Sequence, residues 1–122
     1  MDSYYGVDQN SFIEVRSGSV WTPSFRWIQR SNNQPVDLTG CVAIFTMVQS
    51  RNNLVAFTDE SDSSPTSISI DENIGRVALN VSAEMTKTFK PGLYKADLKI
   101  IFPDGSDKAT KIFQVRVEEG LS

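Results

Sequence analysis

The stretch that decides the fold is residues 75–106, which read GRVALNVSAEMTKTFKPGLYKADLKIIFPDGS. Alternate positions in its first part are apolar, namely Val77, Leu79 and Val81. A longer run, 93–102, repeats this alternation with Tyr94, Ala96, Leu98, Ile100 and Phe102. Because successive side chains of a β-strand point to opposite faces, each run predicts a strand with one buried face. Turn formers at 103–105 follow the second run, so the stretch predicts an antiparallel β domain.

A short polar link joins these two predicted strands and carries a helix-start signal. The hydroxyl of Ser82 can accept a backbone N–H at a helix N-terminus, and Glu84 places a negative charge in the first turn. Pro91 and Gly92 end any helix that begins there, so about two turns fit at most. Tyr94 lies early in the following strand, where its hydroxyl is placed to brace a loop.

The remainder of the chain divides into short apolar runs separated by turn formers. These runs cover 12–15, 21–27, 41–48, 54–58, 66–71 and 109–117. The run at 41–48 is apolar on both faces, which predicts a central strand covered on both sides or one with a partner beyond it. Pro23 predicts an edge strand or a bulge, since proline cannot donate to a ladder. About seven to nine strands with at most one short helix predict an all-β protein, a β-sandwich or a small barrel.

Length and composition predict one domain that binds neither nucleic acid nor membranes. The 122 residues divide into a flexible N-terminal arm at 1–10, a single domain at 11–119 and a short tail at 120–122. The net charge is −3, and 12 Lys and Arg are interleaved with 15 Asp and Glu, so no basic stripe is present for phosphate binding. The chain shows no secretory signal, and no apolar run reaches the ~20 residues of a membrane helix. We therefore expect a protein made without export.

The residue types needed for most catalysis are missing. The chain has no histidine, and its single cysteine, Cys41, can form no intrachain disulfide and is expected to be a small buried hydrophobe. Asp59, Glu60 and Asp62 cluster in a serine-rich loop, which is expected to be solvated, with a weak calcium site as the alternative. Asp97 stands between two lysines on one strand face and is expected to pair across strands. We expect neither an enzyme nor a cofactor.

The aromatic residues are the candidates for a binding role. The run at 21–27 places Trp21, Phe25 and Trp27 on one strand face, which is either a stacking platform for sugars or bases, or core. We expect Phe25 and Trp27 to be core and Trp21 to lie at the surface as a protein contact. The adjacent Tyr4 and Tyr5 are either part of a disordered arm or an anchor that docks on a neighbouring subunit. Tyr4, Tyr5 and Trp21 are therefore the candidate interface residues.

Several short motifs, taken in order, resemble a family of phage proteins. They are GSVWTPSFRW at 18–27, PVDLTG at 35–40, GRVALNVSAEMT at 75–86, PGLYKADL at 91–98 and PDG at 103–105. In this order the motifs are similar to small tail-associated proteins of tailed bacteriophages, and to the immunoglobulin-like N-terminal domain of baseplate upper proteins. The likeness covers about residues 12–118. Those proteins continue into a further region, so the resemblance implies an isolated module or one part of a larger assembly.

This resemblance implies an immunoglobulin-like antiparallel sandwich and a structural role. The protein would be a non-enzymatic component of the virion, in the tail, baseplate or head–tail region, made in the host cytoplasm. Its partners would be other virion structural proteins and copies of itself, as a homo-oligomer in the particle. The alternative is a carbohydrate- or receptor-binding sandwich that contacts a host glycan, which Trp21, Trp27, Tyr4 and Tyr5 motivate.

Overall fold

The computed structural model describes residues 3–7, 12–29, 32–64, 66–109 and 112–120. Its strands are β1 (Ser3–Val7), β2 (Phe12–Arg16), β3 (Ser24–Gln29), β4 (Val42–Gln49), β5 (Val55–Glu60), β6 (Ile68–Asp71), β7 (Arg76–Leu79), β8 (Gly92–Ile101), β9 (Asp107–Ala109) and β10 (Phe113–Glu118). One short helix, α1 (Ala83–Thr86), precedes β8. These elements confirm the prediction of an all-β protein with a short helix in the polar link.

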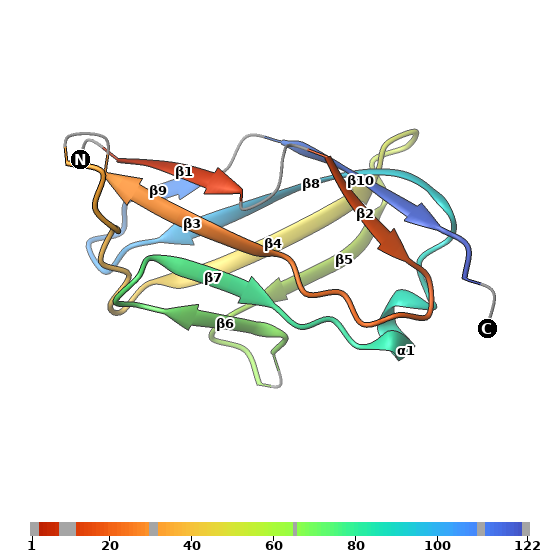
Figure 1. The fold of residues 1–122 in the computed structure, drawn as a ribbon, viewed down its shortest axis with the longest axis horizontal. Helices are drawn as coiled ribbons and strands as arrows, with labels where there is room; N and C mark the ends of the chain where they lie inside the picture. The colour runs from red at the N-terminus through yellow and green to blue at the C-terminus, as the bar shows by residue number, and fades with distance from the viewer. Residues whose placement is uncertain (1–2, 8–11, 30–31, 65, 110–111, 121–122) are drawn as a thin grey trace.

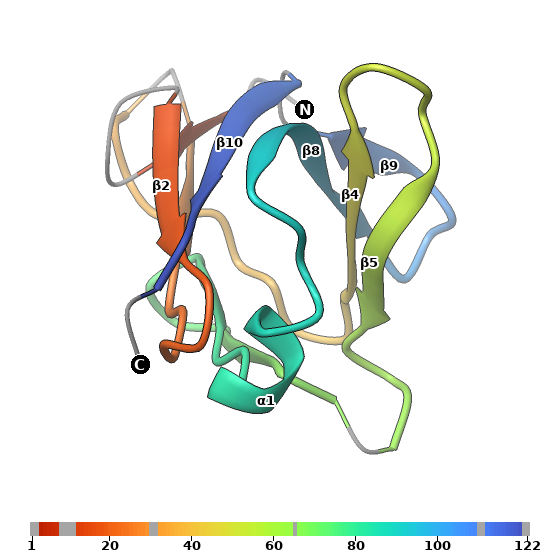
Figure 2. The same ribbon diagram turned by 90° about the vertical axis from the view of Figure 1, so that its right-hand side faces the viewer.

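The strands form two sheets that face each other as the layers of a sandwich (Figures 1 and 2). The smaller sheet has the order β1-β3-β7-β6, and the larger sheet has the order β2-β10-β8-β4-β5, with β9 pairing with β8. Every pair is antiparallel except β2 with β10, which run parallel. The described part of the predicted return strand at 109–117 belongs to the last residue of β9 and to β10, which pair with different parts of β8. The antiparallel sandwich is thereby confirmed, and the small barrel is not formed.

The core lies between the two sheets and contains the residues that alternation placed there. From the smaller sheet come Phe25, Trp27, Val77 and Leu79, and from the larger sheet come Ala43, Phe45, Met47, Tyr94, Ala96, Leu98, Ile100, Phe113, Val115 and Val117. Trp27 is 2% exposed and Phe25 is 0% exposed, so both are core residues, as predicted. Ring pairs such as Phe25 with Phe113, whose centroids lie 5.5 Å apart, join the two layers across the core.

Tyr94 braces the loop before its strand, as its position predicted. Its hydroxyl donates to the Lys90 carbonyl oxygen at 2.6 Å. Burial raises the pKa of the Tyr94 phenol, and the hydrogen bond to Lys90 acts in the opposite direction. A tyrosine near the start of a strand that bonds backward to the main chain is the tyrosine corner of immunoglobulin-like sandwiches.

Helix α1 forms where the cap signal predicted it and closes one end of the sandwich (Figure 2). The Ser82 hydroxyl accepts the Met85 N–H at 3.1 Å, and Glu84 lies in the first turn. The helix ends at Thr86, which is fully buried although it is polar. The Thr86 hydroxyl donates to the Ser19 carbonyl at 2.8 Å and accepts the Gly18 N–H at 3.1 Å. Thr86 thus fastens the helix to the turn between β2 and β3.

Replacing Thr86 with valine is expected to lower the free energy of unfolding by about 1–3 kcal/mol, because valine keeps the shape of this buried side chain but removes its part-buried hydrogen bonds to Gly18 and Ser19. Urea denaturation measures this loss. Thr88→Val is the matched control, since the Thr88 hydroxyl donates to the Met85 carbonyl at an exposed position and its loss should cost less than about 1 kcal/mol. Equal effects of the two variants would contradict the role given to Thr86.

Part of the predicted arm belongs to the domain. Residues 3–7 form β1, and its register sets Tyr4 opposite Ile28 and Tyr5 opposite Trp27 on β3. The sequence predicted a flexible arm at 1–10, whereas these five residues are paired with β3 as part of the smaller sheet. The physical reason is that a strand can be held by main-chain hydrogen bonds to a sheet edge, which a weak apolar pattern does not reveal. The other predicted arm residues, 1–2 and 8–10, and part of the tail, 121–122, lie outside the described residues.

Candidate interaction surface

Trp21 is buried and cannot serve as the surface contact that the sequence suggested. It is 6% exposed, and its ring packs edge-on against Phe45 with centroids 5.8 Å apart. Its main chain forms a bridge with Val81 through two hydrogen bonds of 3.0 and 2.8 Å. The following Pro23 is buried as well and precedes β3. Trp21 is therefore ordered by backbone pairing, and its side chain continues the inward face of β3.

The sugar-binding alternative loses the two tryptophans that motivated it. Trp21 and Trp27 are both in the core, so neither presents a ring to a sugar or a base. Tyr4 and Tyr5 are placed by the main chain of β1, and their side chains lie outside what the structure describes. The aromatic row found in the sequence is a core feature of the sandwich.

The acidic loop has a structural role that its composition did not show. One oxygen of Asp59 accepts the Glu60 N–H at 2.9 Å, and the other accepts the Ser67 N–H at 2.6 Å. Asp59 thus ties the two ends of the loop together, while Glu60 and Asp62 are exposed. In the described part of the chain, no group of three or more histidine, cysteine, aspartate or glutamate residues is placed to hold a metal ion.

Cys41 is half-buried, which differs from the full burial expected of it. It precedes β4 and packs against the rim of the core. Burial raises the pKa of its thiol, and the nearby carboxylates of Asp37, Glu72 and Asp104 act in the same direction. A thiol with a raised pKa carries little of the nucleophilic thiolate at neutral pH. Cys41 is therefore not a candidate nucleophile.

The outer face of the larger sheet is the candidate interaction surface. β4 lies between β8 and β5, and it is apolar on both faces, as the sequence predicted. Its inward residues fill the core, whereas its outward Val42, Ile44 and Val48 are half-buried. No element among the described residues covers this outer face, because the smaller sheet lies on the opposite side (Figure 2). The sequence predicted that both faces of this strand would be covered, but among the described residues only its core face is.

Exposed apolar residues extend this face around Val48. Val55 lies directly opposite Val48 on β5, and Leu93 and Ile112 come from β8 and from the segment before β10. Val55 is 61% exposed, Leu93 is 49% exposed and Ile112 is 67% exposed. We call Val48, Val55, Leu93 and Ile112 the outer patch. Single exposed apolar residues are ordinary, but several on one sheet face make that face a candidate site of contact.

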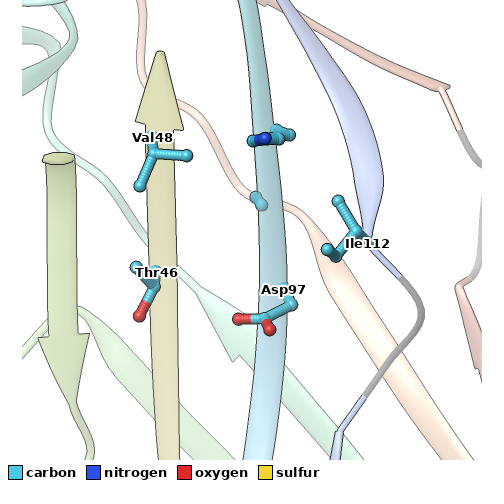
Figure 3. A pocket seen from close by; sticks show the side chains of 6 residues that line it. Thr46, Val48, Asp97 and Ile112 are labelled. Carbon is cyan, nitrogen blue, oxygen red and sulfur yellow. The ribbon is translucent and has the colours of Figure 1, made fainter. Parts of the chain in front are cut away.

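A hollow of about 130 Å³ opens within the outer patch (Figure 3). It is lined by Thr46, Val48, Lys95, Ala96, Asp97 and Ile112. The register of β4 and β8 sets Thr46 opposite Asp97 and Val48 opposite Lys95. Figure 3 shows Thr46 and Val48 on β4, Asp97 on β8, and Ile112 on the far side of β8 where the chain enters β10. Ile112 directly precedes β10, whose first residue, Phe113, lies opposite Ala96 on β8.

Among the described residues that line the hollow, Asp97 is the acidic one. Burial raises the pKa of its carboxyl group, and the charge of Lys99 lowers it by a smaller amount. The cross-strand ion pair expected for Asp97 is not formed in the described structure, where its partner across β4 is Thr46. Lys99 instead pairs with Asp107 at 3.5 Å. The reason is that β9 supplies an acidic neighbour to Lys99, and β9 ends at Ala109, opposite Lys99 and short of Asp97.

Replacing Asp97 with asparagine is expected to raise the melting temperature at pH 7 by a few degrees at most, since the group is partly exposed. A raised pKa means that the folded state binds the Asp97 proton more tightly than the unfolded state. This contribution to stability is full below the ordinary pKa of 3.8 and is lost as the pH rises through the raised value. Melting curves of both proteins should therefore differ at pH 7 and converge near pH 3.5. The same difference at both pH values would contradict this assignment.

Comparisons with known proteins identify the fold. No protein-family model matches the chain, and no curated protein sequence matches it. In structure it resembles CopC from Methylosinus trichosporium OB3b, with a TM-score of 0.56, 9% identity, and coverage of 98% of each chain. It also resembles the Lin-41 filamin domain, with a TM-score of 0.55, 11% identity, and coverage of 95% of this chain and 93% of that one.

A third similar chain comes from the structure describing T cell specificity and activation by the bacterial superantigen toxic shock syndrome toxin-1. It has a TM-score of 0.56, 11% identity, and coverage of 95% of this chain and 99% of that chain. At such low identity these likenesses show the fold alone, an immunoglobulin-like β-sandwich. The same fold serves many unrelated functions, so function must be argued from the surface. No helix of the described residues is long and apolar enough to span a membrane.

Proposed function

We propose that this protein is a non-enzymatic structural component of a tailed-phage virion, in the tail, baseplate or head–tail region. It acts through contacts with other virion proteins and with copies of itself. The observation that carries the proposal is the outer patch, an uncovered apolar surface on the larger sheet. A patch of this kind, with polar residues around it, is typical of a protein–protein contact.

The motif resemblance supports the choice of a phage protein. Its residues have identifiable roles in the fold, since Ser82 caps α1, Thr86 anchors that helix and Tyr94 forms the tyrosine corner. Gly40 adopts a φ of 75° in the turn before β4, a conformation that favours glycine. Motifs that hold one sandwich together in this order favour a shared fold, and the phage family that they resemble is structural.

Presence in the particle is the direct test. Purified virions of the parent phage are labelled with an antibody against this chain and observed by negative-stain microscopy, and their proteins are identified by mass spectrometry. Labelling at one defined position in the tail region is the expected result. Absence of the protein from purified particles overturns the proposal.

Variants of the outer patch test the surface itself. Val55→Ser and Ile112→Ser are expected to leave the melting temperature within a few degrees, because both side chains are more than half exposed. Incorporation into virions should nevertheless fall several-fold in the double variant. Val20→Ser is the matched control, since Val20 is 59% exposed but lies between β2 and β3, outside the outer patch. Equal incorporation of the control and the double variant would show that the contact lies elsewhere.

A further inference from the structure

The hollow in the outer patch joins a carboxylate to apolar walls. Val48 and Ile112 form walls on either side, and Asp97 lies between them with its carboxyl group partly buried (Figure 3). Neither a hydrogen bond nor an ion pair of this carboxylate is formed within the described residues, and its neighbour across β4, Thr46, lines the same hollow. A partly desolvated carboxylate without a partner is unfavourable in the isolated protein.

We propose that this hollow receives an arginine or lysine side chain of the protein that binds the outer patch. The inference rests on the proposed function in one respect only, namely that the basic side chain belongs to a protein that binds this surface. Arginine and lysine carry a long apolar stem that can pack against Val48 and Ile112, while the charged head reaches Asp97. A guanidinium group can also give two parallel hydrogen bonds to one carboxylate.

The charges around Asp97 leave room for such a cation. Lys99 points its ammonium group toward Asp107, at 3.5 Å. Lys95 lies two residues from Asp97 on the same strand face and lines the hollow, but it is not within ion-pair distance of any carboxylate in the described residues. Among the described residues that line the hollow, Lys95 is the basic group with which a partner's basic side chain competes, and Lys99, which acts on Asp97 through its charge, is already paired with Asp107. The partner's side chain would replace water at Asp97 with a full positive charge in a less polar setting.

Binding to the hollow can be tested in the full chain with a small cation that has both an apolar stem and a charged head. The probe is n-butylguanidinium, which has an apolar stem and a guanidinium head, and the observable is the NMR shift of the Asp97 carboxyl carbon. Binding with a Kd on the order of 10 mM is expected, as suits a ligand of this size. The apparent pKa of Asp97 should fall when the probe is present, because a nearby positive charge favours the carboxylate.

Three matched measurements make the test decisive. Asp97→Asn should weaken binding of n-butylguanidinium by about tenfold, detected through the amide shifts of Thr46 and Val48. Lys95→Gln should leave the affinity unchanged or raise it, because it removes the competing cation. Neutral n-butanol should shift the same signals far less at equal concentration. Equal binding to the wild-type protein and Asp97→Asn, or equal effects of n-butanol, overturns the inference.

An incorporation assay with virions distinguishes a failure of this inference from a failure of the proposed function. Asp97→Arg should abolish incorporation into virions, and Lys95→Gln should retain it. If the protein is absent from virions but binds n-butylguanidinium through Asp97, the proposed function fails and the cation site stands. If Asp97→Arg is incorporated normally beside a wild-type control, the protein is a virion component but the hollow is not its contact, and the inference is overturned.

Discussion

The free energy of unfolding is expected to fall by about 3–5 kcal/mol when Trp27 is replaced by alanine. The Trp27 ring is 2% exposed and belongs to the core, so its removal leaves a large cavity between the sheets. A domain of this size has about 5–15 kcal/mol of stability in total, so the variant should be partly unfolded near body temperature. Thermal melting followed by circular dichroism, together with urea denaturation, measures the loss.

The control for this substitution is Val20→Ala, which removes an apolar side chain that is 59% exposed. Its melting temperature should stay within about two degrees of the parent. If Trp27→Ala melts as the control does, the ring is not buried, and the aromatic row regains its interpretation as a binding platform.

A second large effect is expected from replacing Gly75 with alanine. Gly75 has a φ of 65°, and a Cβ atom added there would lie 2.7 Å from the Trp27 carbonyl oxygen and 3.0 Å from that of Val36. These backbone atoms cannot easily move, since the Trp27 N–H donates to the Gly75 carbonyl at 2.8 Å and the Val36 N–H to the Trp27 carbonyl at 2.9 Å. Clash and backbone strain together should cost about 3 kcal/mol or more.

Gly105→Ala separates these two causes. Gly105 has a φ of 90°, but a Cβ atom there would meet no heavy atom within 4 Å. Its substitution therefore reports backbone strain alone, about 1–2 kcal/mol. A loss at Gly75 no larger than that at Gly105, measured by urea denaturation, would show that the backbone around Trp27 yields to the added methyl group.

Strand identity in this chain could be predicted because one face of each strand is buried. The alternation from Tyr94 to Phe102 predicted one buried strand face, and the aromatic residues of the run at 21–27 predicted another. The structure places both faces in the core. The helix cap at Ser82 could be predicted for a similar reason, because it depends only on a hydrogen bond between the Ser82 hydroxyl and the nearby Met85 N–H. Periodicity and short-range chemistry suffice for features of this kind.

Features that depend on distant parts of the chain could not be predicted. Trp21 is buried because its main chain pairs with Val81, sixty residues away along the chain. In the sequence, Thr86 resembles an ordinary polar residue. Its role is evident only in the folded protein, where the Gly18 N–H donates to its hydroxyl. Likewise, Ile112 lines the hollow at Asp97 because β10 pairs with β8, and no local signal in the sequence predicts this pairing.

The parallel pairing of β2 with β10 has a consequence for how the protein is made. β10 is an interior strand of the larger sheet, and it joins β2 to residues roughly 100 positions further along the chain. β10 is the strand that pairs with β2, and it also pairs with one edge of β8. During synthesis, both pairings must therefore wait until residues 113–118 have left the ribosome. Translation runs at about 5–20 residues per second, so the earlier strands wait several seconds with apolar faces exposed. We expect folding to be late and all at once, and a nascent chain stalled before residue 113 to remain sensitive to protease.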